Sequence, residues 1–170
     1  MKLLIEKLPD LQALYLNQLR LLLSAEQQVA DSLPRLIEKA TDSHVKDVFK
    51  TQLGKIENRR KGIEAFVGRA NPKVHPIGCK TMSSLIDEAE DIIQEADSSA
   101  VCDAGLLSTA HKILQYEEGS YGVVNQLAQA LGLQGDAQIL DESMRGIVET
   151  KIAVAGISQQ VNRAALRISK

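Results

Sequence analysis

The sequence predicts a single all-α domain over residues 1–170, an antiparallel bundle of four long helices with one short extra helix. Three observations support this prediction. The 170 residues are enough to form one domain with a sizeable core. Hydrophobic residues make up 44% of the chain and aromatic residues only 3%, a composition that suits helix packing better than a β-sandwich. Apolar residues recur every three or four positions, and no segment alternates as a half-buried strand would.

The first helix is expected from about Asp10 to Ala40. Its apolar face consists of residues three or four positions apart: Leu11, Leu14, Gln18, Leu22, Ala25, Val29, Leu33, Leu36 and Ala40. Pro34 removes one helical hydrogen bond, so a kink or bulge is expected there. The second helix is expected from about His44 to Ala70, after a turn at residues 41–43 that can also cap it.

The clearest break in the chain is residues 71–78, which contain two prolines and end in a glycine. After it we expect a short helix from about Thr81 to Ala96, and a third long helix that is capped within residues 97–99 and stops at Gly132. Asp136 is expected to cap the last helix, whose apolar stripe is Leu140, Met144, Ile147, Ile152, Ala155, Val161 and Ile168. Short turns join the first helix to the second and the third to the fourth, whereas the long middle connection crosses over the bundle. This connectivity is that of a ferritin-like four-helix bundle.

Charge and composition argue against several classes of function. The net charge of −2 and a pI near 5.9 provide no electrostatic footprint for nucleic acid. We interpret the one basic cluster as a solvated helix face: Lys55, Arg59, Arg60 and Lys61. Cys79 and Cys102 form neither a disulfide framework nor a zinc motif, and no segment is apolar enough to span a membrane or serve as a signal peptide. We therefore expect a cytoplasmic protein with no nucleic-acid or membrane partner.

Two acidic residues interrupt the apolar stripes. Glu26 lies among leucines and alanines on the buried side of the first helix, and Glu117 lies between Leu114 and Tyr121 in the third long helix. A buried ionised carboxylate costs several kcal/mol unless it is paired or coordinated. In di-iron bundles the metal offsets this cost: two helices supply one Glu each, and the other two supply Glu-x-x-His. Carboxylate and imidazole ligands of this kind suit iron or manganese.

The second and fourth long helices supply no Glu-x-x-His, and none of the three histidines has metal-ligand spacing with a carboxylate: His44, His75 and His111. A site for one ion that uses Glu26, Glu57 and Glu117 is conceivable, although Lys55 and Lys151 nearby argue against a dinuclear centre. The alternative is that Glu26 and Glu117 are satisfied by a buried Lys or Arg, by a tyrosine hydroxyl or by a shared proton. We favour this second interpretation over metal binding.

At several stretches the chain resembles the YciE/YciF-like family of bacterial stress-associated, ferritin-like proteins, as a divergent member. The matching stretches are Ser24-Ala25-Glu26-Gln27-Gln28, Leu33-Pro34-Arg35-Leu36, Gly78-Cys79-Lys80-Thr81-Met82, Val101-Cys102-Asp103-Ala104-Gly105-Leu106 and Gln115-Tyr116-Glu117-Glu118-Gly119-Ser120-Tyr121-Gly122. The resemblance implies that metal-bearing members use carboxylates from all four helices, of which Glu26 and Glu117 are kept. It places Glu57 where members carry His or Glu. The other acidic positions fall on Gly54, Lys55 and residues around Arg145 to Lys151.

Two functions follow from this pattern. The first is a non-enzymatic, stress-associated protein without a cofactor, with a degenerate di-metal site, that acts as a homodimer or through another protein partner. Gly119 and Gly122 inside a helix favour close approach of a second subunit. The alternative is an iron- or manganese-binding carboxylate protein, similar to an oxidase or ferroxidase, that uses Glu26, Glu57, Glu117 and Glu149 in a changed geometry. Because the matching ligands are missing, we favour the first and expect no enzymatic activity.

Overall fold

The structure is a computed structural model of the chain that describes residues 7–70 and 77–168. These residues form five α-helices and no strand: α1 (Leu11–Lys39), α2 (Ser43–Ala70), α3 (Lys80–Glu95), α4 (Ser99–Ala130) and α5 (Gln134–Ile168). None of these five helices combines the length and the apolar character that crossing a membrane would need. The prediction of an all-α chain with four long helices and one short one is confirmed.

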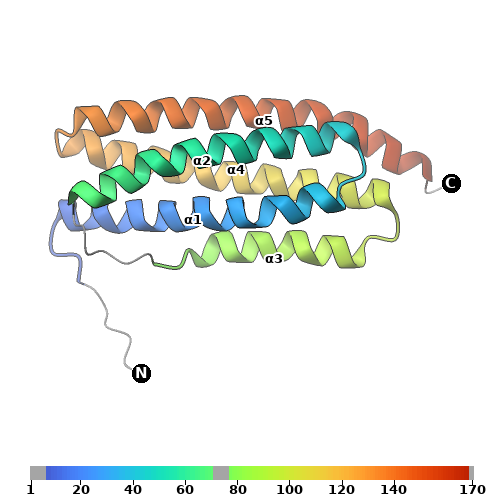
Figure 1. Ribbon diagram of the computed structural model, residues 1–170, viewed down its shortest axis with the longest axis horizontal. Helices are drawn as coiled ribbons and strands as arrows, with labels where there is room; N and C mark the ends of the chain where they lie inside the picture. The colour runs from blue at the N-terminus through green and yellow to red at the C-terminus, as the bar shows by residue number, and fades with distance from the viewer. Residues whose placement is uncertain (1–6, 71–76, 169–170) are drawn as a thin grey trace, which may run out of the picture.

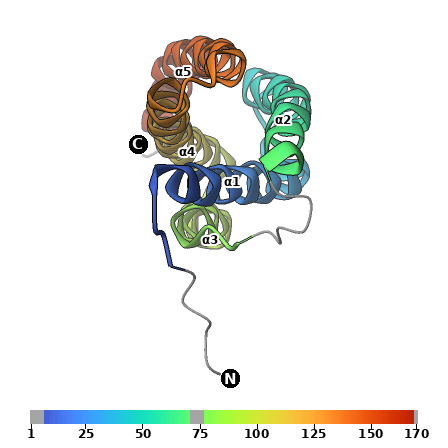
Figure 2. The same cartoon turned by 90° about the vertical axis from the view of Figure 1, so that its left-hand side faces the viewer.

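The four long helices form an antiparallel bundle, and α3 packs on its outside (Figures 1 and 2). In the bundle, α1 contacts α2 and α4, and α5 contacts α4 and α2, whereas α3 contacts only α1 and α4 among its closest neighbours. Because α3 runs back along the bundle after α2, α4 begins at the opposite end from where α2 finishes (Figure 1). The predicted crossover connection with a short helix is therefore confirmed.

The helix ends follow the local chemistry of the chain. Asp10 caps α1 and Ser98 caps α4, each by accepting a hydrogen bond from a backbone N–H three residues later. Gly132 ends α4 with a φ of 72°, in the left-handed region that glycine tolerates best. The prediction for the last helix was wrong, because α5 already begins at Gln134 and Asp136 lies inside its first turn. The side chain of Asp136 instead bonds across the bundle.

The turn between α1 and α2 is fixed to the start of α4 by Asp103. This buried carboxylate accepts hydrogen bonds from the Thr41 backbone N–H at 2.8 Å, the Thr41 hydroxyl at 2.6 Å and the Asp42 backbone N–H at 2.9 Å. Asp103 thereby satisfies the donors of a turn that follows one helix and precedes the next. One side chain holds three helix ends together at this end of the bundle.

The predicted apolar stripes locate most of the core, but one side of α5 was assigned wrongly. Leu140, Ile147 and Val161 are buried as expected. Ile152, however, is 69% exposed and Ala155 is also on the surface. The helix instead turns Val154 and Thr150 inward, and these residues share a face with the buried ones. Around Pro34, α1 continues as a single helix. The predicted break at residues 71–78 lies mostly outside the described residues, as does His75.

Candidate functional site

The two acids that interrupt the apolar stripes meet at a buried arginine. Glu26 of α1 and Glu117 of α4 are both 0% exposed, and both contact Arg59 of α2. Arg59 binds Glu26 through two hydrogen bonds, from Nε to Oε1 at 2.8 Å and from Nη2 to Oε2 at 3.1 Å. Its Nη2 also donates to Glu117 Oε2 at 3.4 Å. Tyr121 of α4 donates its hydroxyl to Glu26 Oε1 at 2.8 Å. These four residues form a core network that joins three helices.

The position of Arg59 contradicts the interpretation of its cluster as a solvated face. Arg59 is only 8% exposed, whereas Lys61 points to solvent. The sequence did contain a signal that Arg59 is buried. Position 59 lies three residues after Ile56 and four before Ile63, both of which are buried, so all three share one face of α2. An arginine in an otherwise apolar stripe is expected to be the counter-ion of buried acids on other helices.

Burial sets the protonation of the network. Desolvation lowers the pKa of Arg59, but the charges of Glu26 and Glu117 more than offset this effect, so the guanidinium stays protonated. Burial, reinforced by the charge of Glu26 and partly offset by Arg59, raises the pKa of Glu117 to about 8. At neutral pH the network therefore contains one guanidinium, one carboxylate on Glu26 and one protonated acid on Glu117, and these charges cancel.

The second carboxyl oxygen of Glu117 supports the assignment of a proton to this side chain. Glu117 Oε1 is buried and has no hydrogen-bond partner among the described residues. An unpaired oxygen costs much less on a neutral acid than on an ionised carboxylate. Tyr121 also stays protonated, because burial, and then the charge of Glu26, raises its pKa well above the ordinary value. Tyr121 can therefore act as a hydrogen-bond donor throughout the physiological range.

The other acids proposed as ligands do not join the pair. The side chain of Glu57 is exposed, because its position is two residues, about 200° of helix rotation, away from Arg59. Glu149 is also exposed and pairs with Lys55 at 3.5 Å on the surface between α2 and α5. Within residues 7–70 and 77–168 no group of three or more His, Cys, Asp or Glu is arranged to hold a metal ion. The structure thus brings together Glu26 and Glu117 and leaves Glu57 apart.

The inward positions of α2 and α5 at this level of the bundle carry no Glu-x-x-His. Next to the network, the buried residues of α2 that lie three apart are Ile56 and Arg59. The buried pair of α5 at the same level is Ile147 and Thr150. Lys55 reaches the Thr150 hydroxyl at 3.3 Å, so these two segments lie at the same level of the bundle. Di-iron bundles carry Glu-x-x-His at two such pairs of positions. This chain carries Ile-x-x-Arg and Ile-x-x-Thr.

These inward positions are not the ones to which the resemblance assigned the acids of the second and fourth long helices. The resemblance placed an acidic pair of the second helix on Gly54 and Lys55 and acids of the last helix near Arg145. In the structure Gly54 and Arg145 are exposed, and Lys55 lies at the edge between α2 and α5. Burial along each helix assigns the inward positions directly, which sequence matching could not do without identical residues to align.

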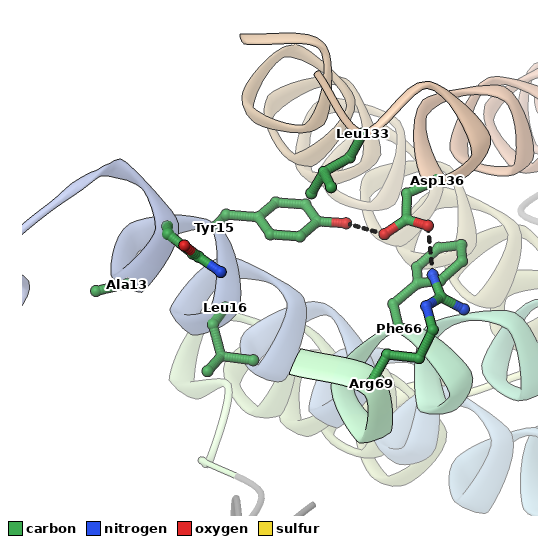
Figure 3. Close-up of a pocket in the computed structure, with 8 residues that line it drawn as sticks. Ala13, Tyr15, Leu16, Phe66, Arg69, Leu133 and Asp136 are labelled. Atoms are coloured by element: carbon green, nitrogen blue, oxygen red, sulfur yellow. Dashed lines mark hydrogen bonds and ion pairs between the residues drawn. The ribbon is translucent and has the colours of Figure 1, made fainter. Parts of the chain in front are cut away.

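A separate cavity of about 280 Å³ lies at the end of the bundle where α1 begins and α2 ends (Figure 3). At its edge Tyr15 donates its hydroxyl to Asp136 at 3.0 Å, and Arg69 pairs with the same carboxylate. The Arg69 guanidinium also stacks over Phe66, 5.0 Å from the ring centroid. Burial, and then the hydrogen bond to Asp136, raises the pKa of Tyr15. Asp136 therefore ties α5 to α1 and α2, and the cluster acts as a structural clamp.

Comparison with known proteins shows the same fold elsewhere. The model of a family described as a domain of unknown function (DUF892) matches residues 10–166. The chain is 29% identical to protein YciF of Escherichia coli strain K12 over 144 residues, which cover 84% of this chain and 87% of YciF. The crystal structure of the E. coli stress protein YciF superimposes with a TM-score of 0.86 at 26% identity, over 91% of this chain and 98% of that one. A structure of YcfI from Rhodopseudomonas palustris gives a TM-score of 0.84 at 22% identity, over 90% and 98% of the two chains, and shows the fold alone.

Proposed function

The chain belongs to the DUF892 family, which confirms the resemblance seen in its motifs, and we propose that it is a non-enzymatic member with a degenerate di-metal site. In this proposal Arg59 supplies the positive charge that metal ions supply in di-iron bundles. The protein then acts through association, either with a second copy of itself or with another protein. YciF, a relative, is described as a stress protein, and this description supports a role of the present chain in stress.

The observation that carries this proposal is the guanidinium between the two buried acids. Both oxygens of Glu26 already accept hydrogen bonds from Arg59, and one of them also accepts the hydroxyl of Tyr121. A cation that binds Glu26 would have to displace Arg59 and leave a charged guanidinium in the core, a cost of several kcal/mol. The inward positions of α2 and α5 offer isoleucine and threonine, which are poor ligands for iron or manganese.

A cytoplasmic location also belongs to this proposal. The two cysteines, Cys79 and Cys102, are both free thiols, although Cys79 is buried and Cys102 partly so. Unpaired cysteines are typical of reducing compartments. Cys79 contacts the hydroxyl of Tyr116 at 3.1 Å, which gives this thiol a packing role beside the start of α3.

The alternative, an iron- or manganese-binding protein, is favoured by one observation. Glu117 leaves one buried oxygen without a partner among the described residues, and such an atom could bind a cation if Arg59 moved away. The two functions are separated by metal analysis of the full chain after incubation with Fe(II) or Mn(II) and gel filtration. We expect far less than one ion per chain, unchanged by Glu26→Gln. Near-stoichiometric metal that is lost in Glu26→Gln would establish the alternative.

A reconstruction of the ligands tests whether the site is degenerate. The variant Ile56→Glu, Arg59→His, Ile147→Glu and Thr150→His restores Glu-x-x-His at the inward positions of both helices. We expect it to take up iron or manganese, because it supplies the complete set of ligands of a di-iron bundle. The control carries acids at exposed positions, Gly54→Glu and Arg145→Glu, and should take up none. A reconstructed variant that folds and binds no metal would contradict this origin of the site.

A further inference from the structure

The cavity at the end of the bundle where α1 begins has an apolar side and a polar edge (Figure 3). Its apolar side is formed by residues from three segments: Ala13 and Leu16 of α1, Phe66 of α2, and Leu133 of the turn between α4 and α5. Leu133 is 38% exposed, although it is a large apolar residue. The open space of about 280 Å³ leaves apolar surface in contact with water, and a ligand that fills this space would bury that surface.

The polar edge of the cavity exposes a positive charge and covers a negative one. The side chain of Arg69 is 59% exposed, whereas that of its partner Asp136 is only 16% exposed. Both carboxylate oxygens of Asp136 already accept hydrogen bonds, Oδ1 from Arg69 and Oδ2 from Tyr15. Arg69 uses Nη2 for this contact, and a guanidinium has five N–H donors, so donors remain for a ligand. The charged group that the cavity offers to a ligand is therefore a cation.

Arg69 is held in place before any ligand arrives. Its guanidinium stacks over Phe66, 5.0 Å from the ring centroid, and its ion pair with Asp136 fixes it further. Tyr15 holds Asp136 in turn, and it stays protonated because burial raises the pKa of its hydroxyl. Tyr15 thus adds no second negative charge at this edge. A side chain that is fixed in this way loses little conformational entropy on binding.

We propose that this cavity binds a small monocarboxylate with a short apolar body, aliphatic or aromatic. The carboxylate accepts hydrogen bonds from the free N–H groups of Arg69, because a planar guanidinium matches the two oxygens of a carboxylate. The apolar body lies against Leu16 and Leu133. The cavity, at about 280 Å³, is at the lower end of the roughly 300–1,000 Å³ of ligand pockets, so a long-chain fatty acid would not fit. Such a site is separate from the core network and adds ligand binding to the association proposed above.

Binding is measured by two-dimensional ¹H–¹⁵N NMR of the full chain, titrated with benzoate and with hexanoate up to about 10 mM in a buffer without carboxylates. We expect a dissociation constant on the order of 0.1–1 mM for either probe, since a ligand of this size makes few contacts. The shifted amide signals should belong to residues 12–16, 66–69 and 133–136. Benzamide has the shape of benzoate without its charge, and it should bind about tenfold more weakly or worse.

Two variants separate the polar edge from the apolar side. Arg69→Gln removes the guanidinium and should weaken benzoate binding about tenfold or more. Its matched control is Arg145→Gln, because Arg145 is 66% exposed and also pairs with an aspartate, Asp141 at 3.2 Å, but lies more than two turns of α5 beyond the cavity. Ala13→Leu fills part of the apolar side without touching the clamp, and it should abolish binding of both probes. Circular dichroism checks the fold of each variant.

Several results would overturn the site. One is the absence of shifted signals at about 10 mM of either probe. Others are benzamide binding as tightly as benzoate, or unchanged benzoate binding in Arg69→Gln, because either shows that the guanidinium does not recognise the carboxylate. Tighter binding of hexylammonium than of hexanoate would make Asp136 the recognition group and would also refute the proposal. If Arg69→Gln does not fold, Ala13→Leu decides, and benzoate binding that survives in this variant would contradict the cavity as the site.

Discussion

The buried carboxyl of Glu117 should make this protein less stable as the pH rises, and Glu117→Gln should remove that dependence. Burial raises the pKa of Glu117 to about 8 in the folded state, whereas the unfolded chain has the ordinary value of 4.5. Between these two values the folded protein binds one proton more than the unfolded chain. The free energy of unfolding therefore falls as the pH rises through this interval. Glutamine has the same shape, stays neutral and has no proton to release.

The magnitude follows from the two pKa values. Their difference of about 3.5, at about 1.36 kcal/mol for each pKa unit, gives on the order of 5 kcal/mol over the whole interval. The stability that protonated Glu117 provides is fully present below pH 4.5 and fully lost above pH 8. From pH 5 to pH 8 the wild type should lose roughly 3–4 kcal/mol relative to Glu117→Gln, because both titrations overlap the ends of this range.

The assay is urea unfolding of both proteins at pH 5, 6, 7 and 8, followed by circular dichroism. The difference in unfolding free energy between the two proteins is the informative quantity, because the other titrating groups are shared and cancel. We expect the unfolding free energy of the variant, relative to that of the wild type, to rise by somewhat more than 1 kcal/mol for each pH unit. A difference that is constant across this range, or that changes in the opposite direction, would refute the assignment of a proton to Glu117.

Four further variants test other parts of the structure. Arg59→Leu removes the counter-ion of buried Glu26 and should lower the free energy of unfolding by about 3–5 kcal/mol, as measured by urea unfolding. Asp103→Asn weakens the acceptor that holds the α1–α2 turn and should cost about 2 kcal/mol, with faster amide hydrogen exchange in that turn. Gly119→Ala should raise the melting temperature by stabilising the helix by about 1 kcal/mol, because its Cβ would meet nothing within 4 Å. Gly105→Ala should lower the melting temperature, because its Cβ would lie 2.5 Å from a side-chain atom of α3.

The sequence predicts the fold well because the helices obey simple periodicity. Turn residues such as Gly132 and capping residues such as Ser98 marked the boundaries to within a few positions. The connectivity followed from the lengths of the loops. Glu26 and Glu117 were recognisable because a charged residue in an apolar stripe departs from an otherwise regular pattern.

The features that sequence missed depend on packing between helices. The sequence predicts a surface position for Arg59 because three neighbours in sequence are also basic or polar, although only position 59 faces the core. The sequence predicts a core position for Ile152 because α5 has apolar residues on two faces, and periodicity alone does not show which face contacts α2 and α4. Packing within the chain does not require glycine at positions 119 and 122. A Cβ on Gly122 would lie 3.9 Å from Met144 of the same chain, and one on Gly119 would meet nothing.

The arginine in the core has a consequence for how this protein matures. A counter-ion that is part of the polypeptide is made with it, so the network of Glu26, Arg59 and Glu117 can form once α1, α2 and α4 have been synthesised. Chelators and metal starvation would then leave its stability unchanged, and a guanidinium has no second oxidation state to cycle through. Such a core could persist under conditions in which a di-iron bundle loses its ions.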